Sequence, residues 1–261
     1  MLSKVVSSVS EAVADLFDGA SLAVGGFGLC GVPVDLIDAV VESGATDLVV
    51  VSNNCGLDGW GLGRLLAQHR IARVIGSYVG ENREFARQFL AGELEVELVP
   101  QGSLAERLRA GGCGIPAFYT ASGVGTLIAE GGLPWRYAAD GTVALASPPR
   151  EVREFDGRQY VLERAITTDF ALVRASRGDT VGNLVFDKAT RNFNPLCAMA
   201  GRVAIAEVEE LVPAGAIDPA SVHLPGIFVQ RVVQADRSRE KQIEKRTVRP
   251  REAAAGVGED T

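Results

Sequence analysis

The sequence predicts an α/β fold in which an open, mostly parallel sheet is flanked by helices and carries antiparallel additions in its second half. In the first half of the chain, short apolar runs alternate with amphipathic stretches at intervals of about 25 residues, as in repeated βα units. The run Leu48–Val51 is apolar at every position, as expected of a parallel strand covered on both faces. In the second half, Asp156-Gly157 separates two strand-like runs and indicates an antiparallel hairpin.

The first half supplies four predicted strands and the helices between them. Each strand is a short apolar run, and each helix has apolar residues at helical spacing; the helix that begins at Val34 is expected to end before Gly44. The predicted strands are Leu22–Val24, Leu48–Val51, Val74–Ile75 with Tyr78, and Val96–Val99. The predicted helices are Ser10–Phe17, Val34–Glu42, Gly61–His69, Glu84–Leu90 and Leu104–Arg109, the last followed by a glycine loop at 111–114.

The second half is expected to be richer in antiparallel elements. Its predicted strands are Thr142–Ala146, the two strands of a hairpin within Val152–Val161, Phe170–Val173, Leu184–Phe186, Val203–Ile205 and Ile227–Val233. We interpret residues 1–235 as one intimate domain, because no sharp boundary divides them. Residues 236–261 are charged, then small and acidic, and lack hydrophobic periodicity, so we expect a tail that is disordered or wrapped on a partner.

Composition and charge limit the classes of function. The 261 residues are 47% hydrophobic and 23% charged, which is ordinary for a soluble globular protein with a substantial core. The net charge of −7 argues against a nucleic-acid partner, because phosphate backbones require clustered positive charge. The sequence begins without a signal-peptide pattern and contains no run of membrane-spanning length, so we expect a cytoplasmic protein with no membrane partner.

The cysteines favour neither a metal site nor a disulfide framework. They are widely spaced, without a C-x-x-C pair, at Cys30, Cys55, Cys113 and Cys197. Only two histidines, His69 and His223, could help them to bind a metal, so we expect no metal and reduced thiols, as in the cytosol. Cys30 lies in a glycine-rich turn, where a small residue packed against the next helix is a better interpretation than a reactive thiol.

The most informative stretch is a glycine-rich turn between the first predicted strand and the next helix. Four glycines fall within the seven residues Gly25–Gly31, between the turn pair Asp18-Gly19 and Pro33. Glycine permits positive φ and lets a ligand approach backbone N–H groups without a Cβ in the way. A strand, a glycine turn and a helix start can therefore form an anion-binding nest. The alternative is a turn that only lets the strand and helix pack closely.

Residues 26–31 also satisfy the G-x-G-x-x-G pattern of dinucleotide-binding proteins. That fingerprint requires an acidic residue about 20 positions further on, at the end of the second strand, to bind the ribose. Here the second strand ends in Ser52-Asn53-Asn54, so the acid is missing. A nicotinamide-dependent oxidoreductase is therefore the weaker alternative.

Polar or glycine-rich residues follow each of the four predicted strands, at the sheet edge where open parallel sheets bind ligands. The amides considered as ligand contacts are Asn53, Asn54 and Gln101. Together with the glycine turn they would bind carboxylate or thioester oxygens through neutral donors. Turn and capping roles are the alternative, and a capping box is the better interpretation of Ser103 with Glu106. Gln101 is a poor capping residue, which favours a binding role.

The stretch from Asp18 to Pro33 resembles, without a gap, the signature of the family I coenzyme A (CoA) transferases. That signature is Asp-Gly, two residues, three apolar residues, Gly-Gly-Phe, three residues, Gly, one residue and Pro. Further segments are similar to the A subunits of the succinyl-CoA:3-oxoacid branch of this family. They are Ser52–Gly56, Ser77–Asn82, Gly92–Leu98, Pro100–Arg107, Gly114–Thr120, Pro149–Phe155 and Arg191–Asn194.

The resemblance implies a reaction and a partner. In this family a glutamate carboxylate attacks the acyl-CoA thioester, and the released thiolate returns to give an enzyme–CoA thioester, which a second acid reverses in a ping-pong cycle. That glutamate belongs to a B subunit. The resemblance therefore implies that two A and two B chains move CoA between succinyl-CoA and a 3-oxo acid such as acetoacetate. CoA thioester is a substrate, and no permanently bound cofactor is implied.

The resemblance also implies roles for particular residues. Asn53 stands where the B subunit has its nucleophile, and an amide cannot form the anhydride, so no catalytic residue is expected in this chain, which should be inactive alone. Asn53, Asn54 and Gln101 would orient the substrate carboxylate and acyl oxygen. The stretch implied to bind CoA, or else to shape the subunit interface, is Gly25, Gly26, Phe27, Gly28, Leu29, Cys30 and Gly31. Glu81 is the one acid in the predicted site, but its context differs from the B-subunit motif, and we do not expect it to be the nucleophile.

Two further alternatives stay open. The chain could be the A subunit of a transferase for another acid, such as 3-oxoadipate or a short-chain fatty acid, if the residues that set acyl preference lie on the partner. It could also be a non-catalytic module that binds CoA or an acyl group. A binding module would bind ligand alone and gain no rate with any partner.

Overall fold

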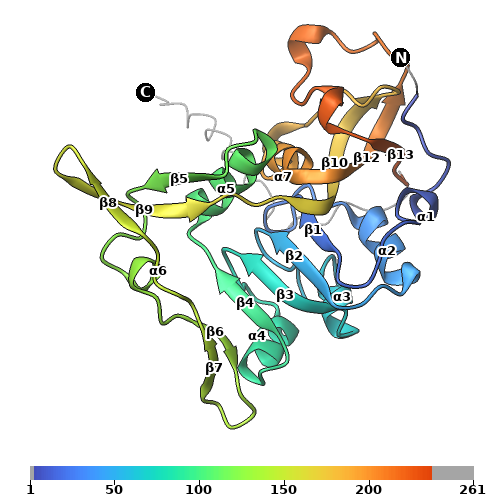
Figure 1. Cartoon of the computed structure of the whole chain (residues 1–261). Coiled ribbons are helices and arrows are strands. Elements are labelled where there is room, and N and C mark those ends of the chain that lie inside the picture. The colour runs from blue at the N-terminus through green and yellow to red at the C-terminus, as the bar shows by residue number, and fades with distance from the viewer. Residues whose placement is uncertain (1–2, 237–261) are drawn as a thin grey trace, which may run out of the picture.

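The computed structural model describes residues 3–236 and is centred on one open sheet (Figure 1). Seven strands run parallel in the order β13-β12-β10-β1-β2-β3-β4, and β11 pairs antiparallel with β10. The strands are β1 Ser21–Val24, β2 Leu48–Ser52, β3 Ile71–Gly76, β4 Glu95–Leu98, β10 Thr168–Asp179, β11 Leu184–Val185, β12 Gly201–Val212 and β13 Arg231–Gln234. This architecture confirms the predicted fold class.

The direction in which the sheet grows reverses between β1 and β10. The chain places β1 to β4 successively on one side, then returns to β10 and adds β12 and β13 on the other. Val24, the last residue of β1, lies opposite Leu172 of β10 and Ser52 of β2. In open α/β sheets, ligands bind beyond the carboxyl ends of the strands at such a switch point. The glycine turn begins there.

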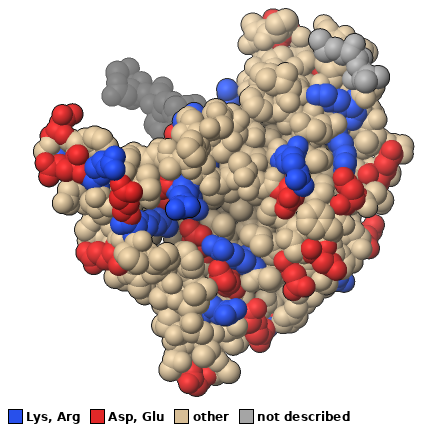
Figure 2. Space-filling model, in the orientation of Figure 1, with Lys and Arg blue, Asp and Glu red and all other residues tan. Residues whose placement is uncertain are grey.

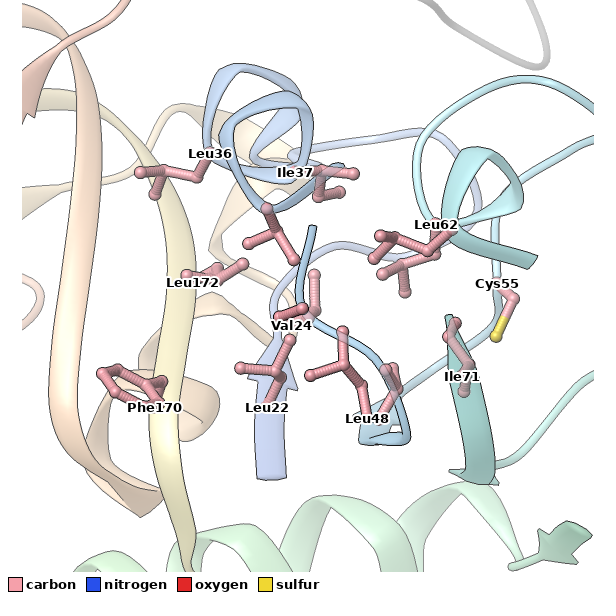
Figure 3. Close-up of a cluster of buried hydrophobic side chains, with 14 of the residues drawn as sticks. Leu22, Val24, Leu36, Ile37, Leu48, Cys55, Leu62, Ile71, Phe170 and Leu172 are labelled. Carbon is pink, nitrogen blue, oxygen red and sulfur yellow. The ribbon is translucent and has the colours of Figure 1, made fainter. Parts of the chain in front are cut away.

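Helices cover both faces of the sheet. Because side chains alternate along a strand, Leu22 and Val24 of β1 enter one core and Ala23 enters the other. Figure 3 shows the first core, in which Leu36 and Ile37 of the helix after the glycine turn lie beside these strands. The helices are α1 Val9–Ala12, α2 Val34–Ser43, α3 Gly63–Ala67, α4 Arg83–Leu90, α5 Gln101–Gly112, α6 Leu127–Glu130 and α7 Asn194–Ala200.

The observed helix boundaries agree best with the predicted ones where a capping residue ends the helix. α2 ends at Gly44, whose φ of 80° is the left-handed conformation that stops a helix. α1 is much shorter than predicted, because from Val13 onward the backbone makes i→i+3 bonds, such as the N–H of Leu16 to the carbonyl of Val13, instead of α-helical ones. The predicted strand Ile227–Val233 is also wrong at its start, where a short 3₁₀ turn occupies Gly226–Phe228.

α5 differs from its prediction at both ends. It begins at Gln101 after Pro100, so Ser103 lies inside the first turn and the predicted capping box is wrong. The predicted loop glycines Gly111 and Gly112 form the last turn of the helix. A Cβ on Gly111 would lie 1.9 Å from the carbonyl oxygen of Ile166, so close packing rather than a loop requires glycine there.

The second half contributes more to the parallel sheet than the sequence predicts, since β10 and β12 are each 12 residues long. The expected antiparallel additions form two arms that project from the sheet (Figure 1). Their strands are β5 Ala117–Thr120, β9 Arg158–Arg164 and β8 Val152–Phe155 in one arm, and β6 Pro134–Tyr137 and β7 Val143–Ala146 in the other. Asp156 and Gly157 both have positive φ, 51° and 74°, as the predicted hairpin turn requires.

The surface charge and the helix lengths can be compared with what a nucleic-acid or membrane partner would require. Figure 2 shows acidic and basic side chains interspersed over the face seen in Figure 1, without the broad basic area that a nucleic acid would need. Among residues 3–236, no helix is long and apolar enough to cross a membrane. Of the predicted tail, only Asp236 falls within the described residues.

Candidate active site

The glycine turn leaves β1 at the switch point and folds into a tight hairpin. Phe27 and Cys30 exchange two backbone hydrogen bonds, with N···O distances of 3.0 and 2.9 Å. Gly28, between them, has a φ of 56°, and Phe27 is 51% exposed. Gly26 combines a φ of 116° with close packing, because a Cβ there would lie 2.8 Å from a methyl group of Val32. Glycine is therefore required by both conformation and space.

Several polar groups that an anion nest would offer are used within the chain. The N–H of Gly28 donates to Asn53 Oδ1 at 3.3 Å. The N–H of Leu36, in the first turn of α2, donates to Glu207 Oε2 at 3.0 Å. The Glu207 carboxylate thus occupies the helix N-terminus, where a dinucleotide phosphate would lie in a G-x-G-x-x-G protein. This arrangement adds to the case against the dinucleotide alternative.

The structure brings three of the predicted site residues together: Gly28, Asn53 and Gln101. Asn53 follows β2 and is 3% exposed, and its Nδ2 donates to Gln101 Oε1 at 2.9 Å. Gln101 is the first residue of α5 and is exposed. Because its Oε1 accepts from Asn53, its Nε2 carries the remaining donors, and Nε2 makes no hydrogen bond within residues 3–236. This pair of hydrogen-bonded amides, the Asn53–Gln101 relay, therefore orients a free amide donor at the sheet edge.

The other residues predicted at this edge differ in character. Asn54 is 9% exposed, and its side chain makes no hydrogen bond in the described part of the chain. Glu81 is exposed in the loop before α4, whereas Asn82 is 1% exposed and caps that helix. The hydroxyls of Ser77 and Ser103 are buried without hydrogen-bond partners among the described residues. Asn82 is thus structural, and Asn54 stays a candidate ligand contact.

The described residues include neither a disulfide nor a cluster of side chains that could hold a metal ion. All four cysteines are free thiols. Burial raises the pKa of Cys55 to about 12, so this thiol beside the site stays protonated at neutral pH. No group of three or more His, Cys, Asp or Glu side chains within residues 3–236 is arranged to hold a metal ion.

A buried ion pair lies beneath the turn. Glu207 of β12 is 0% exposed, and its Oε1 lies 2.7 Å from Arg174 Nη1 of β10. Desolvation raises the pKa of Glu207 to about 7, although Arg174 opposes the shift and nearby Asp35 adds to it. A buried carboxylate is costly to ionise even beside an arginine.

We expect Glu207→Gln to remove a pH dependence from folding stability. Because the folded-state pKa of Glu207 is above its ordinary value of 4.5, the folded protein keeps a proton that the unfolded chain releases between pH 4.5 and about 7. Wild-type stability should therefore fall as pH rises through that range, by up to about 3 kcal/mol relative to the variant, and level off above it. Urea unfolding of both proteins from pH 4 to 8 measures the difference. A constant difference across this range would contradict the shift.

Four residues around the turn are not among the site residues predicted from the sequence: Arg174, Asn192, Asn194 and Glu207. A signal for two of them was present, since the segment Arg191–Asn194 carries part of the family resemblance. Glu207 is a charged residue inside the otherwise apolar run 203–208, which is itself a sign of a buried partner. Their positions behind the turn depend on the pairing of β10 with β1 and β12.

The chain belongs to the coenzyme A transferase family, whose model matches residues 6–235. This confirms the resemblance found in the sequence. Within the family, the chain is 66% identical over 248 residues to the probable A subunit of succinyl-CoA:3-ketoacid coenzyme A transferase from Mycobacterium bovis, covering 95% of this chain and 100% of that protein. It is 57% identical over 258 residues to the corresponding probable A subunit from Bacillus subtilis, covering 99% of each chain.

The fold is also that of solved acyl-CoA transferases. An acyl-CoA transferase of Escherichia coli O157:H7, solved as a thioester complex with CoA, superposes with a TM-score of 0.77 at 24% identity. The superposition covers 92% of this chain but only 48% of that one, so the chain spans about half the length of the solved enzyme. At this identity the likeness supports the fold alone.

Proposed function

We propose that this chain is the A subunit of a two-chain succinyl-CoA:3-ketoacid CoA transferase. The observation that carries the proposal is 66% identity to an A subunit of this kind over that protein's full length. With a B subunit, the chain moves CoA between succinyl-CoA and a 3-oxo acid such as acetoacetate. Its four free thiols suit a reducing compartment, and we place it in the cytoplasm.

The site supports a division of labour between the two chains. The residue at the end of β2 is an amide, Asn53, which cannot be acylated as a carboxylate can. The nucleophilic glutamate is assigned to the B subunit. On this chain, Gln101 and Asn54 face the substrate carboxylate and acyl oxygen, and Asn53 holds Gln101. The glycine turn, Gly25–Gly31, contacts the CoA thioester; within residues 3–236 the N–H groups of Gly26, Leu29 and Gly31 have no other acceptor.

Two narrower alternatives differ in substrate and in chemistry. A relative acting on 3-oxoadipate or a short-chain fatty acid would share this site, because the amides recognise only a carboxylate and a thioester oxygen. A non-catalytic CoA-binding module would need no partner. The identity to the A subunits of 3-ketoacid transferases over nearly the whole chain favours the first proposal over both.

The test is transfer of CoA from succinyl-CoA to acetoacetate, followed by absorbance of the product enolate. The chain is assayed alone and then co-expressed with its B subunit. We expect turnover only in the pair. Turnover by this chain alone would place the nucleophile here and refute the division of labour. Turnover by the pair with another acid but not with acetoacetate would favour a different transferase, and no turnover with any acid would favour the binding module.

A further inference from the structure

The segment before α7 holds the glycine turn from behind. Asn194, the first residue of α7, is 0% exposed, and both ends of its side-chain amide are used. Its Oδ1 accepts from the N–H of Arg174 at 2.9 Å, and its Nδ2 donates to the carbonyl oxygens of Gly31 at 3.0 Å and Thr190 at 2.9 Å. An N–H on one side and carbonyls on the other define the orientation of the amide, and an aspartate could not replace both functions.

The same amide touches both ends of the turn. A Cβ on Gly25 would lie 2.0 Å from Asn194 Oδ1, and a Cβ on Gly31 would lie 2.9 Å from Asn194 Nδ2. Gly25 does not have a positive φ, so it is space for Asn194, and not backbone conformation, that requires glycine there. Asn192 adds a second attachment, because its Nδ2 donates to the carbonyl oxygen of Cys30 at 3.0 Å.

Two paired strands of the sheet support Asn194 from behind. Arg174 lies opposite Glu207 in the paired strands β10 and β12, and their side chains form the buried ion pair. Glu207 in turn accepts from the N–H of Leu36, so the turn and the helix after it are attached to the same two strands. On its other side the turn reaches Asn53 through Gly28. The conformation of the turn therefore helps to fix the position of the Asn53 side chain, and through it that of Gln101.

We propose that Asn194 is a positioning residue for the transfer reaction. It holds Gly25–Gly31 in the conformation that binds the CoA thioester and supports Asn53. Because Asn194 is fully buried, it acts only through the turn and does not touch the substrate. The inference rests on the proposed function and extends it to a residue outside the predicted site.

The test uses Asn194→Asp in the assembled two-chain enzyme. This change keeps the size of the side chain but turns an oxygen, in place of Nδ2, toward two carbonyls. We expect kcat/KM for succinyl-CoA to fall by about tenfold or more, because small misplacements of a binding element have large kinetic effects. The value for acetoacetate, which meets an enzyme already carrying CoA covalently, should change by less than about threefold.

Asn183→Asp is the matched control. Its Nδ2 donates to Asp179 Oδ2 at 2.8 Å and its Oδ1 accepts from the N–H of Gly226 at 2.9 Å, so the same donor-to-acceptor change is made away from the turn. We expect both kcat/KM values to stay within about twofold of wild type. A loss of succinyl-CoA efficiency in Asn194→Asp no larger than in Asn183→Asp would overturn the inference.

A second measurement remains decisive if Asn194→Asp fails to assemble. Gly25→Ala places a Cβ against Asn194, and Asn194→Ala removes most of the atoms it would meet. Gly25→Ala should lower kcat/KM for succinyl-CoA about tenfold in the wild-type background but less than about threefold in the Asn194→Ala background. Equal losses in both backgrounds would overturn the inference. The wild-type pair is assayed first, and absence of transfer there would refute the proposed function instead.

Discussion

Replacing Gln101 by alanine is expected to lower kcat of the assembled enzyme by about 100- to 1,000-fold, the usual cost of removing one donor to a developing oxyanion. The relay explains why one amide matters so much. Asn53 Nδ2 donates to Gln101 Oε1, which leaves the hydrogens of Gln101 Nε2 free of partners among residues 3–236. A donor held in this way needs no reorganisation when charge develops on the acyl oxygen. Steady-state kinetics with saturating succinyl-CoA and acetoacetate measure the loss.

Two further variants separate the donor from the scaffold. Gln101→Glu keeps the size of the side chain and an oxygen for Asn53, but it replaces the free donor, so we expect a loss as large as that of the alanine variant. Gln68, an exposed glutamine at the end of α3, provides the control, and Gln68→Ala should leave kcat unchanged. Gel filtration of each pair checks assembly. Full activity in Gln101→Glu would show that the amide hydrogens are not used.

The parallel strands β1, β2 and β4 could be predicted closely because their sequence signal is local. Leu48–Ser52 is buried on both faces of the sheet, and an apolar run of this kind has few other stable structures. The same holds for α2, whose apolar stripe and following glycine determine its length. The convergence of Asn53 and Gln101 could be predicted as well, because residues that follow the parallel strands of one sheet lie at the same edge.

The parts that could not be predicted depend on contacts between distant segments. The sequence predicts a loop at Gly111 and Gly112, but both residues are helical and pack closely against Ile166 and Met199. β10 and β12 continue through charged residues such as Arg174 and Glu207, which interrupt the apolar pattern and are paired only once the sheet forms. The role of Asn194 is hidden for the same reason, since Gly31, whose carbonyl oxygen accepts from its Nδ2, lies more than a hundred residues away in the sequence.

A second buried ion cluster joins an arm to the sheet, and it also could not be predicted from the sequence. Glu97 of β4 and Glu163 of β9 are 4% and 1% exposed, and Arg107 of α5 lies between them. Arg107 Nη1 is 2.7 Å from Glu97 Oε1, and Arg150 pairs with Glu163. Burial raises the pKa of Glu163 despite these arginines. In this cluster, each charge depends on the others for compensation.

Arg107→Met is therefore expected to lower the free energy of unfolding by about 3–5 kcal/mol, because methionine fills similar space but removes the one cation that lies between the two buried carboxylates. Glu97 would keep Arg73 as its partner and Glu163 would keep Arg150. The substitution also removes the hydrogen bond from Arg107 Nε to the carbonyl oxygen of Arg164, which attaches the arm at β9. Arg109→Met is the matched control on the same helix. Arg109 pairs with Glu106 and its side chain is 40% exposed, so its loss should have a far smaller effect. Urea unfolding of the wild type and of the two variants measures these changes in the free energy of unfolding. Equal losses in the two variants would mean that the carboxylates that join the arm to the sheet do not need Arg107 for compensation.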